Sequence, residues 1–160
     1  MARRKGRILA FQALFSWDMG NKDVASLMDF PWEHAFKEDV PQDEDKTASV
    51  PHGPKESETF ARLLVAGTIE HIEEIDALIT KHLDSWELHR INKVDLAILR
   101  ISVYPLLYQK DLHPSIVNNE AVDISKEFGS DDSYKFVNLI YLDTDKTCPY
   151  GICNYILDLI

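Results

Sequence analysis

The chain has little of what metal centres, disulfide-rich folds and nucleotide-binding enzymes require. Its only two cysteines, Cys148 and Cys153, have no histidine nearby. This spacing gives neither a zinc site nor a disulfide framework, and it is typical of a reduced, cytoplasmic protein. The six glycines are scattered, so no glycine-rich loop is available to hold a phosphate. No paired carboxylates or activated nucleophile stand out, and we expect no cofactor, no metal and no catalysis.

Long apolar runs are also missing. No stretch approaches the roughly 18 uninterrupted apolar residues of a membrane-spanning helix. The basic start is followed by RILAFQALFSWDM, whose aromatic and polar residues interrupt the apolar core that a signal peptide needs. The sequence therefore predicts a soluble chain. Its 160 residues suffice for one domain that buries roughly 70% of its unfolded surface.

Positive charge is scarce and unevenly placed. The formal net charge is −10, which argues against a general polyanion binder because phosphates are repelled at long range. However, four of the first seven residues are cationic: Arg3, Arg4, Lys5 and Arg7. Residues 37–57 instead combine prolines with acidic side chains and few apolar ones, which predicts a flexible acidic loop. A local basic site on an acidic body remains compatible with this distribution.

Helical periodicity dominates the rest of the chain. The most apolar helical segment is Val94–Tyr108, which we expect to be the central helix, with a kink at Pro105. Residues 57–83 have the apolar spacing of one long helix. Further helices are predicted at residues 4–19, 114–128 and from about 133 onward, with Gly129 ending one of them. The predicted fold class is therefore all-α, with about seven helices.

Two segments are candidates for binding nucleic acid. The basic N-terminal residues form either a solvated, frayed tail or an arm that orders on RNA. The last predicted helix carries Tyr134, Lys135, Phe136 and Asn138. Single-stranded RNA requires rings for stacking, cations for phosphates and polar groups for base edges. The same residues are also compatible with core aromatics and a polar flank, and composition does not separate the two interpretations.

Three segments together resemble the transcription antitermination factor NusB family. These are AFQALFSWDM after the basic arm, VDLAILRISVYPLLY, and NEAVDISKEFGSDDSYKFVN. The resemblance covers about residues 3–138. It implies two small helical bundles and an RNA-binding transcription factor rather than an enzyme. Such proteins bind single-stranded boxA RNA of nascent ribosomal RNA together with the ribosomal protein NusE. They then act with other Nus factors on RNA polymerase in the cytoplasm, and no membrane is among their expected partners.

The resemblance also implies roles for individual residues. One carboxylate, Asp95, stands at a position that resembles the NusE-facing surface of the family. The residues that match its RNA-binding positions, with Asp132 as a modulating charge, are Arg3, Arg4, Lys5, Arg7, Gln12, Asp132, Lys135, Phe136 and Asn138.

Several positions depart from the family pattern. Pro105 stands where a glutamate is usual, and Asn118 where an apolar residue is usual. Similarity ends after Asn138, where a glycine and a short helical tail are expected and LIYLDTDKTCPYGICNYILDLI follows instead. We therefore divide the chain into a NusB-like domain at 1–138 and a divergent tail at 139–160. The sequence leaves open whether the tail extends the last helix.

Two alternative functions are weighed against RNA-dependent antitermination. The first is an RNA-targeting domain related to the one in ribosomal RNA methyltransferases. That enzyme needs a cofactor loop and an α/β sheet, which this sequence does not provide. The second is a helical protein-interaction module without RNA binding, which would account for the acidic surface.

Overall fold

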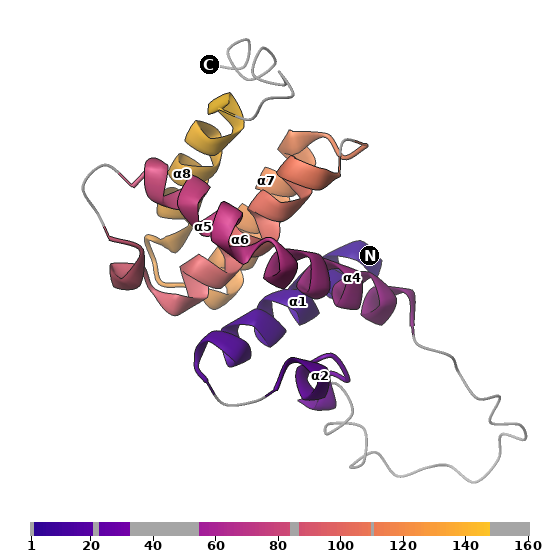
Figure 1. The fold of residues 1–160 in the computed structure, drawn as a ribbon. Coiled ribbons are helices and arrows are strands. Elements are labelled where there is room, and N and C mark those ends of the chain that lie inside the picture. The colour runs from indigo at the N-terminus through magenta and orange to yellow at the C-terminus, as the bar shows by residue number, and fades with distance from the viewer. Residues whose placement is uncertain (1, 21–22, 33–54, 84–86, 110, 148–160) are drawn as a thin grey trace, which may run out of the picture.

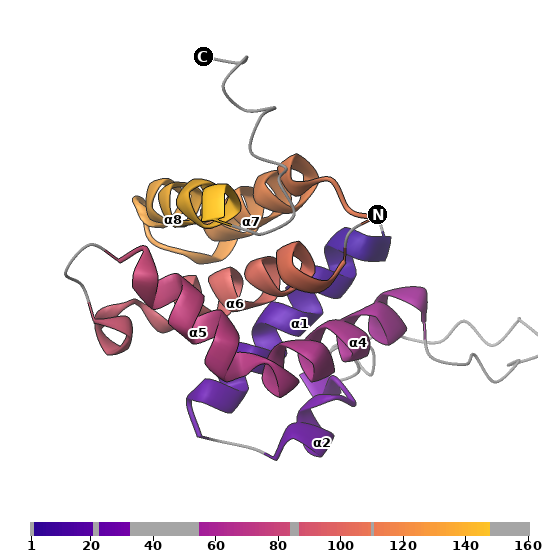
Figure 2. The same ribbon diagram turned by 45° about the horizontal axis from the view of Figure 1, so that its top comes forward.

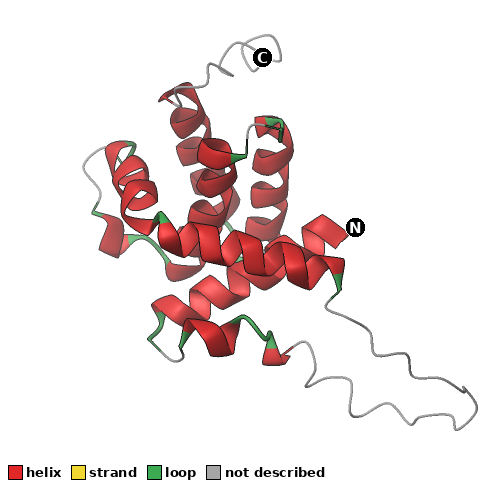
Figure 3. Cartoon of the chain, turned by 45° about the vertical axis from the view of Figure 1, so that its right-hand side comes forward, coloured by secondary structure: helices red, strands yellow, loops and turns green. Residues whose placement is uncertain are grey.

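The described part of the chain is helical, as the sequence predicts. The computed structural model describes residues 2–20, 23–32, 55–83, 87–109 and 111–147, with side chains up to Ile140. Within these ranges there is no strand (Figure 3). The elements are α1 (Ala2–Asp18), α2 (Val24–Leu27), α4 (Glu56–Glu70), α5 (Ile72–Lys81), the 3-10 helix η1 (Leu88–Arg90), α6 (Lys93–Tyr108), α7 (Pro114–Phe128) and α8 (Ser133–Thr147). The acidic loop predicted at about 37–57 lies mostly outside the described residues.

The central helix is α6, which is buried on most sides. Asn92 caps it, because its Oδ1 accepts a hydrogen bond from the Val94 N–H at 3.1 Å. In Figure 2, α7 and α8 lie on one side of α6, whereas α1, α4 and α2 lie on the other. The helix continues through the buried Pro105 to Tyr108. No helix in the described residues is long and apolar enough to cross a membrane.

The prediction of one long helix over residues 57–83 is wrong, because α4 and α5 are separate helices. They meet at His71, which leaves helical geometry with φ −109° and ψ 21°. The His71 ring stacks on Tyr108 of α6 with 4.0 Å between ring centroids. Apolar spacing continues across the break, so periodicity alone does not show it. Figure 2 shows the change of direction between α4 and α5, and α5 packs against α6 (see also Figure 1).

The basic residues at the start of the chain belong to α1, which is helical from Ala2. A Cβ at Gly6 would lie only 2.6 Å from the Phe60 ring and 2.8 Å from the Ser57 carbonyl oxygen. Glycine is therefore needed for α1 to approach α4 so closely. The first two turns of α1 are therefore packed against α4. They are not the solvated, frayed tail of the first interpretation.

Arg100 ties three helices together from a nearly buried position on α6. Its Nε and Nη2 donate to the two carboxylate oxygens of Asp76 on α5, at 2.8 and 2.7 Å. Its Nη1 donates to Asp18 of α1 at 3.2 Å, and Asp18 also pairs with Lys93 at 2.6 Å. Burial alone would lower the pKa of Arg100, but Asp76 and Asp18 raise it. The charge is therefore kept because both carboxylates are present.

Replacing Arg100 by leucine should lower the free energy of unfolding by about 3 kcal/mol, because the partly buried Asp76 loses the arginine and Asp18 keeps only Lys93. Chemical denaturation followed by circular dichroism measures this. The control is Lys135→Met, which removes an ion pair whose two side chains are both largely exposed. It should leave the free energy of unfolding nearly unchanged. Equal stability of Arg100→Leu and wild type would contradict a structural role for the network.

Candidate nucleic-acid interface

The four cations of the N-terminal arm do not form one cluster. Arg4 faces α7, where it pairs with Asp123 at 3.3 Å and Glu127 at 3.2 Å. Arg7 is only 4% exposed, and its guanidinium carbon lies 5.4 Å from the centroid of the Phe60 ring. It therefore holds α1 against α4, and a direct RNA contact by Arg7 would need a movement of this side chain. Lys5 is exposed.

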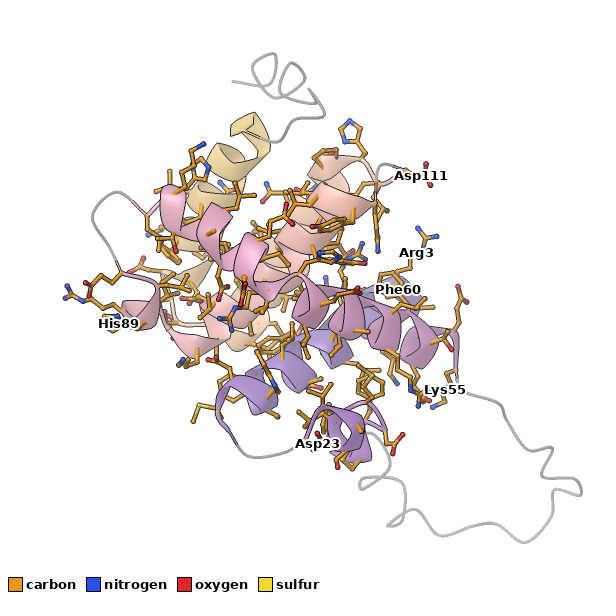
Figure 4. The ribbon with its side chains drawn as sticks, in the orientation of Figure 1. Arg3, Asp23, Lys55, Phe60, His89 and Asp111 are labelled. Carbon is orange, nitrogen blue, oxygen red and sulfur yellow. The ribbon has the colours of Figure 1, made fainter. Side chains whose placement is uncertain are left out.

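Arg3 is the arm residue that extends away from the helices. Figure 4 shows it projecting outward beside Phe60. It lines a surface hollow of about 650 Å³ together with Phe60, Tyr108 and Gln109. Because Arg3 is exposed and makes no ion pair with the described residues, its charge is available to an incoming anion.

A tight corner joins α7 to α8. A Cβ at Gly129 would lie 2.6 Å from both the Ser125 carbonyl oxygen and Ser133 Oγ, so glycine is needed there. The Ser130 N–H donates to Ser133 Oγ at 2.8 Å, which ties the corner to the first residue of α8. The ring of Phe128, the last residue of α7, lies 5.3 Å from that of Phe11. This contact holds α1 along the end of α7, directly before the corner.

The first turn of α8 presents an aromatic ring between two cations. The Tyr134 centroid lies 5.7 Å from Lys135 Nζ and 5.5 Å from Lys126 Nζ of α7. Lys135 and Asp132 are largely exposed and pair at 2.8 Å. The Lys135 ammonium lowers the pKa of Asp132, and the Asp132 carboxylate raises the pKa of Lys135. Sequence reasoning did not select Lys126, although it lies within the KEFG motif.

The remaining candidates are partly engaged by the protein. Phe136 is half-buried against the core. Asn138 Oδ1 accepts a hydrogen bond from Asn118 Nδ2 at 2.9 Å, so the unusual Asn118 joins α7 to α8. Gln12 is half-buried on α1. The structure thus brings Arg4, Lys135 and Phe136 near the α7–α8 corner, whereas Arg3 and Arg7 lie toward α4.

Asp95 lies at a hollow between the start of α6 and the α7–α8 corner. This hollow, which we call the Asp95 hollow, has a volume of about 290 Å³, and its lining includes Arg90, Asn92, Asp132, Ser133 and Phe136. Asp95 is only 6% exposed, and its Oδ1 makes no hydrogen bond within the described residues. Burial raises its pKa, although a hydrogen bond with Ser133 lowers it in part. A group that reaches Asp95 must enter this hollow.

Comparison with known proteins agrees with this arrangement. The fold is that of solved NusB structures: NusB of Thermotoga maritima aligns with a TM-score of 0.72 and 30% identity, over 91% of this chain and 92% of that one. A crystal structure of the antitermination factors NusB and NusE with double-stranded RNA aligns with a TM-score of 0.72 and 28% identity. That alignment covers 91% of this chain and 96% of the other.

The sequence gives the same result. The transcription antitermination protein NusB of Treponema denticola is 49% identical over 146 residues, which cover 91% of this chain and 96% of that protein. The NusB family model matches residues 4–140. The chain therefore belongs to the NusB family, as its motifs predict. The match ends near the predicted domain boundary at 138, while α8 continues to Thr147.

Replacing Asp95 by asparagine should stabilise the free protein at neutral pH. Because the pKa of Asp95 is raised on folding, the native state loses stability as pH rises from the unfolded pKa through the folded one. Asparagine carries no charge and removes that loss, so the free energy of unfolding at pH 7 should rise by about 1 kcal/mol. Thermal melts at pH 7 and at pH 3 measure it. The gain should shrink at pH 3, and a variant destabilised at pH 7 would contradict the account.

Proposed function

We propose that this protein is a transcription antitermination factor that binds boxA-type single-stranded RNA of nascent ribosomal RNA together with NusE. The observation that carries the proposal is the match, over 91% of this chain, to a chain from the solved structure of NusB and NusE with double-stranded RNA. In this role the protein acts in the cytoplasm, with other Nus factors, in an RNA polymerase complex.

The RNA-binding surface that we propose is centred on the α7–α8 corner. Lys126 and Lys135 supply phosphate contacts, while Tyr134 and the half-buried Phe136 offer rings to bases. Gln12, Asp132 and Asn138 would contact or modulate the strand from the flanks, and Arg3, Arg4, Lys5 and Arg7 would extend the surface along α1. The rest of the acidic body repels phosphates, which directs the strand to this face.

Affinity for RNA alone should be modest. Of the four arm cations, Arg4 is paired and Arg7 is buried. If Arg3, Lys126 and Lys135 make the phosphate contacts, the slope of log K against log salt is about −2, from roughly −0.7 per contact on a single strand. Affinity at physiological salt would then depend on NusE joining the complex.

The NusE contact that we propose is at the Asp95 hollow. An unsatisfied carboxylate oxygen in a nearly buried site favours a hydrogen-bond donor from outside. A donor group from NusE that enters the hollow would meet this need and would lie beside Phe136. Both ligands of the protein would then be held at adjacent surfaces, so that one orders the site of the other.

The RNA proposal is tested by fluorescence anisotropy with boxA RNA and a scrambled strand, each with and without NusE. BoxA should bind more tightly, and more so with NusE. Lys135→Ala should weaken boxA binding several-fold and reduce the salt slope by about 0.7. Lys81→Ala, which removes another exposed cation at the end of α5, is the matched control. Equal affinity for the two strands, or equal effects of the two variants, would refute the proposed site.

The NusE proposal is tested by isothermal titration calorimetry with Asp95→Asn. Loss of the acceptor charge should weaken NusE binding about tenfold, a loss typical of a charge-assisted hydrogen bond. Because the variant is expected to be more stable than wild type, such a loss would not reflect unfolding. Asp111→Asn, an exposed residue in the turn that follows α6, serves as control. An unchanged dissociation constant would count against this face.

A further inference from the structure

Arg4 is held by two carboxylates from a distant part of the chain. Its Nη1 lies 3.3 Å from Asp123 Oδ2 and its Nη2 lies 3.2 Å from Glu127 Oε2. The side chains are 38%, 53% and 50% exposed, in the order Arg4, Asp123 and Glu127. The contact is therefore at the surface and is open to solvent and to ligands.

The two carboxylates take the place that a phosphate would take. A guanidinium recognises phosphate through paired N–H donors, and here both terminal nitrogens of Arg4 are already engaged. The three side chains together carry one net negative charge. Asp123 and Glu127 are one turn apart on α7, so they repel each other unless a cation lies between them. In the free protein, Arg4 is thus a stabilising partner of α7 rather than a positive site.

The position of this contact gives it a consequence for RNA. Glu127 directly precedes Phe128 and the α7–α8 corner, and Lys126 is its neighbour in sequence. A strand that passes from Lys135 on α8 to the cations of α1 must cross the end of α7, where these carboxylates lie. It meets repulsion there unless it displaces them from Arg4.

We propose that Asp123 and Glu127 are internal competitors of RNA, which occupy Arg4 in place of a phosphate and thereby set the affinity of the protein for RNA. This inference rests on the proposed function. Binding of the strand exchanges one set of contacts of Arg4 for another, so Arg4 contributes little to affinity in the native protein. Neutral amides at positions 123 and 127 would free it.

The test compares wild type with Asp123→Asn/Glu127→Gln in boxA RNA binding at several salt concentrations. The double variant should bind about fivefold to twentyfold more tightly, with a salt slope steeper by about 0.7 for one more phosphate contact. Arg4→Ala should weaken binding less than twofold in wild type but at least fivefold in the double variant. Glu70→Gln/Glu73→Gln, two exposed acids on α4 and α5, change the net charge equally and should have a much smaller effect.

Weaker binding of the double variant would overturn the inference, because the carboxylates would then position Arg4 for RNA. So would a gain no larger than that of the control, or an equal effect of Arg4→Ala in both backgrounds. Wild type that binds neither strand would instead refute the proposed function itself. Thermal melts confirm that each variant is folded, and Glu127→Gln alone, which should give a smaller gain in the same direction, provides a second variant.

Discussion

The arrangement of both candidate binding surfaces depends on the nearly buried charge of Arg100. Through Asp76 and Asp18 it fixes α6 against α5 and the end of α1. The same α6 carries Asp95 near its start, and the same α1 carries the cations near its own. Because a buried arginine is stable only while its partners remain in place, this network joins α1, α5 and α6 into one frame.

On this frame, an acidic protein presents a small basic face. Lys126 and Lys135 flank Tyr134 at the α7–α8 corner, while the carboxylates of Asp123 and Glu127 neutralise Arg4 beside them. The positions of these charged side chains therefore matter more for RNA binding than the net charge of the protein, because screened interactions act over only about 8–10 Å in physiological salt. The Asp95 hollow lies on the other side of the same corner and shares Asp132 and Phe136 with it. In the proposed assembly, the RNA site and the NusE site are therefore neighbours.

Local sequence patterns were sufficient to predict much of the fold. The helix end at Gly129 and the apolar α6 each depend on a residue and its near neighbours, and the structure shows both. The break between α4 and α5 could not be predicted in this way. It depends on His71 stacking on Tyr108, which is far along the chain, while the apolar period runs on undisturbed.

The candidate site was harder to predict for the same reason. A run of basic residues in the sequence does not reveal that Arg4 pairs with carboxylates more than 100 residues away, or that Arg7 is buried over the Phe60 ring. The family resemblance places Asp95 on a partner-facing surface, whereas the packing of α8 beside it leaves a nearly buried carboxylate in a hollow. The ring and cations around Tyr134 come from two helices, so only their tertiary contact identifies Lys126.

In the proposed complex, the α7–α8 corner binds the RNA together with α1. The most direct measurement is photo-crosslinking of boxA RNA containing 4-thiouridine to the full chain in the presence of NusE, with crosslinked peptides mapped by mass spectrometry. We expect crosslinks in the peptides that contain Lys126 to Phe136 and the first turns of α1. Crosslinks confined to α5, or equal labelling of all helices, would contradict it.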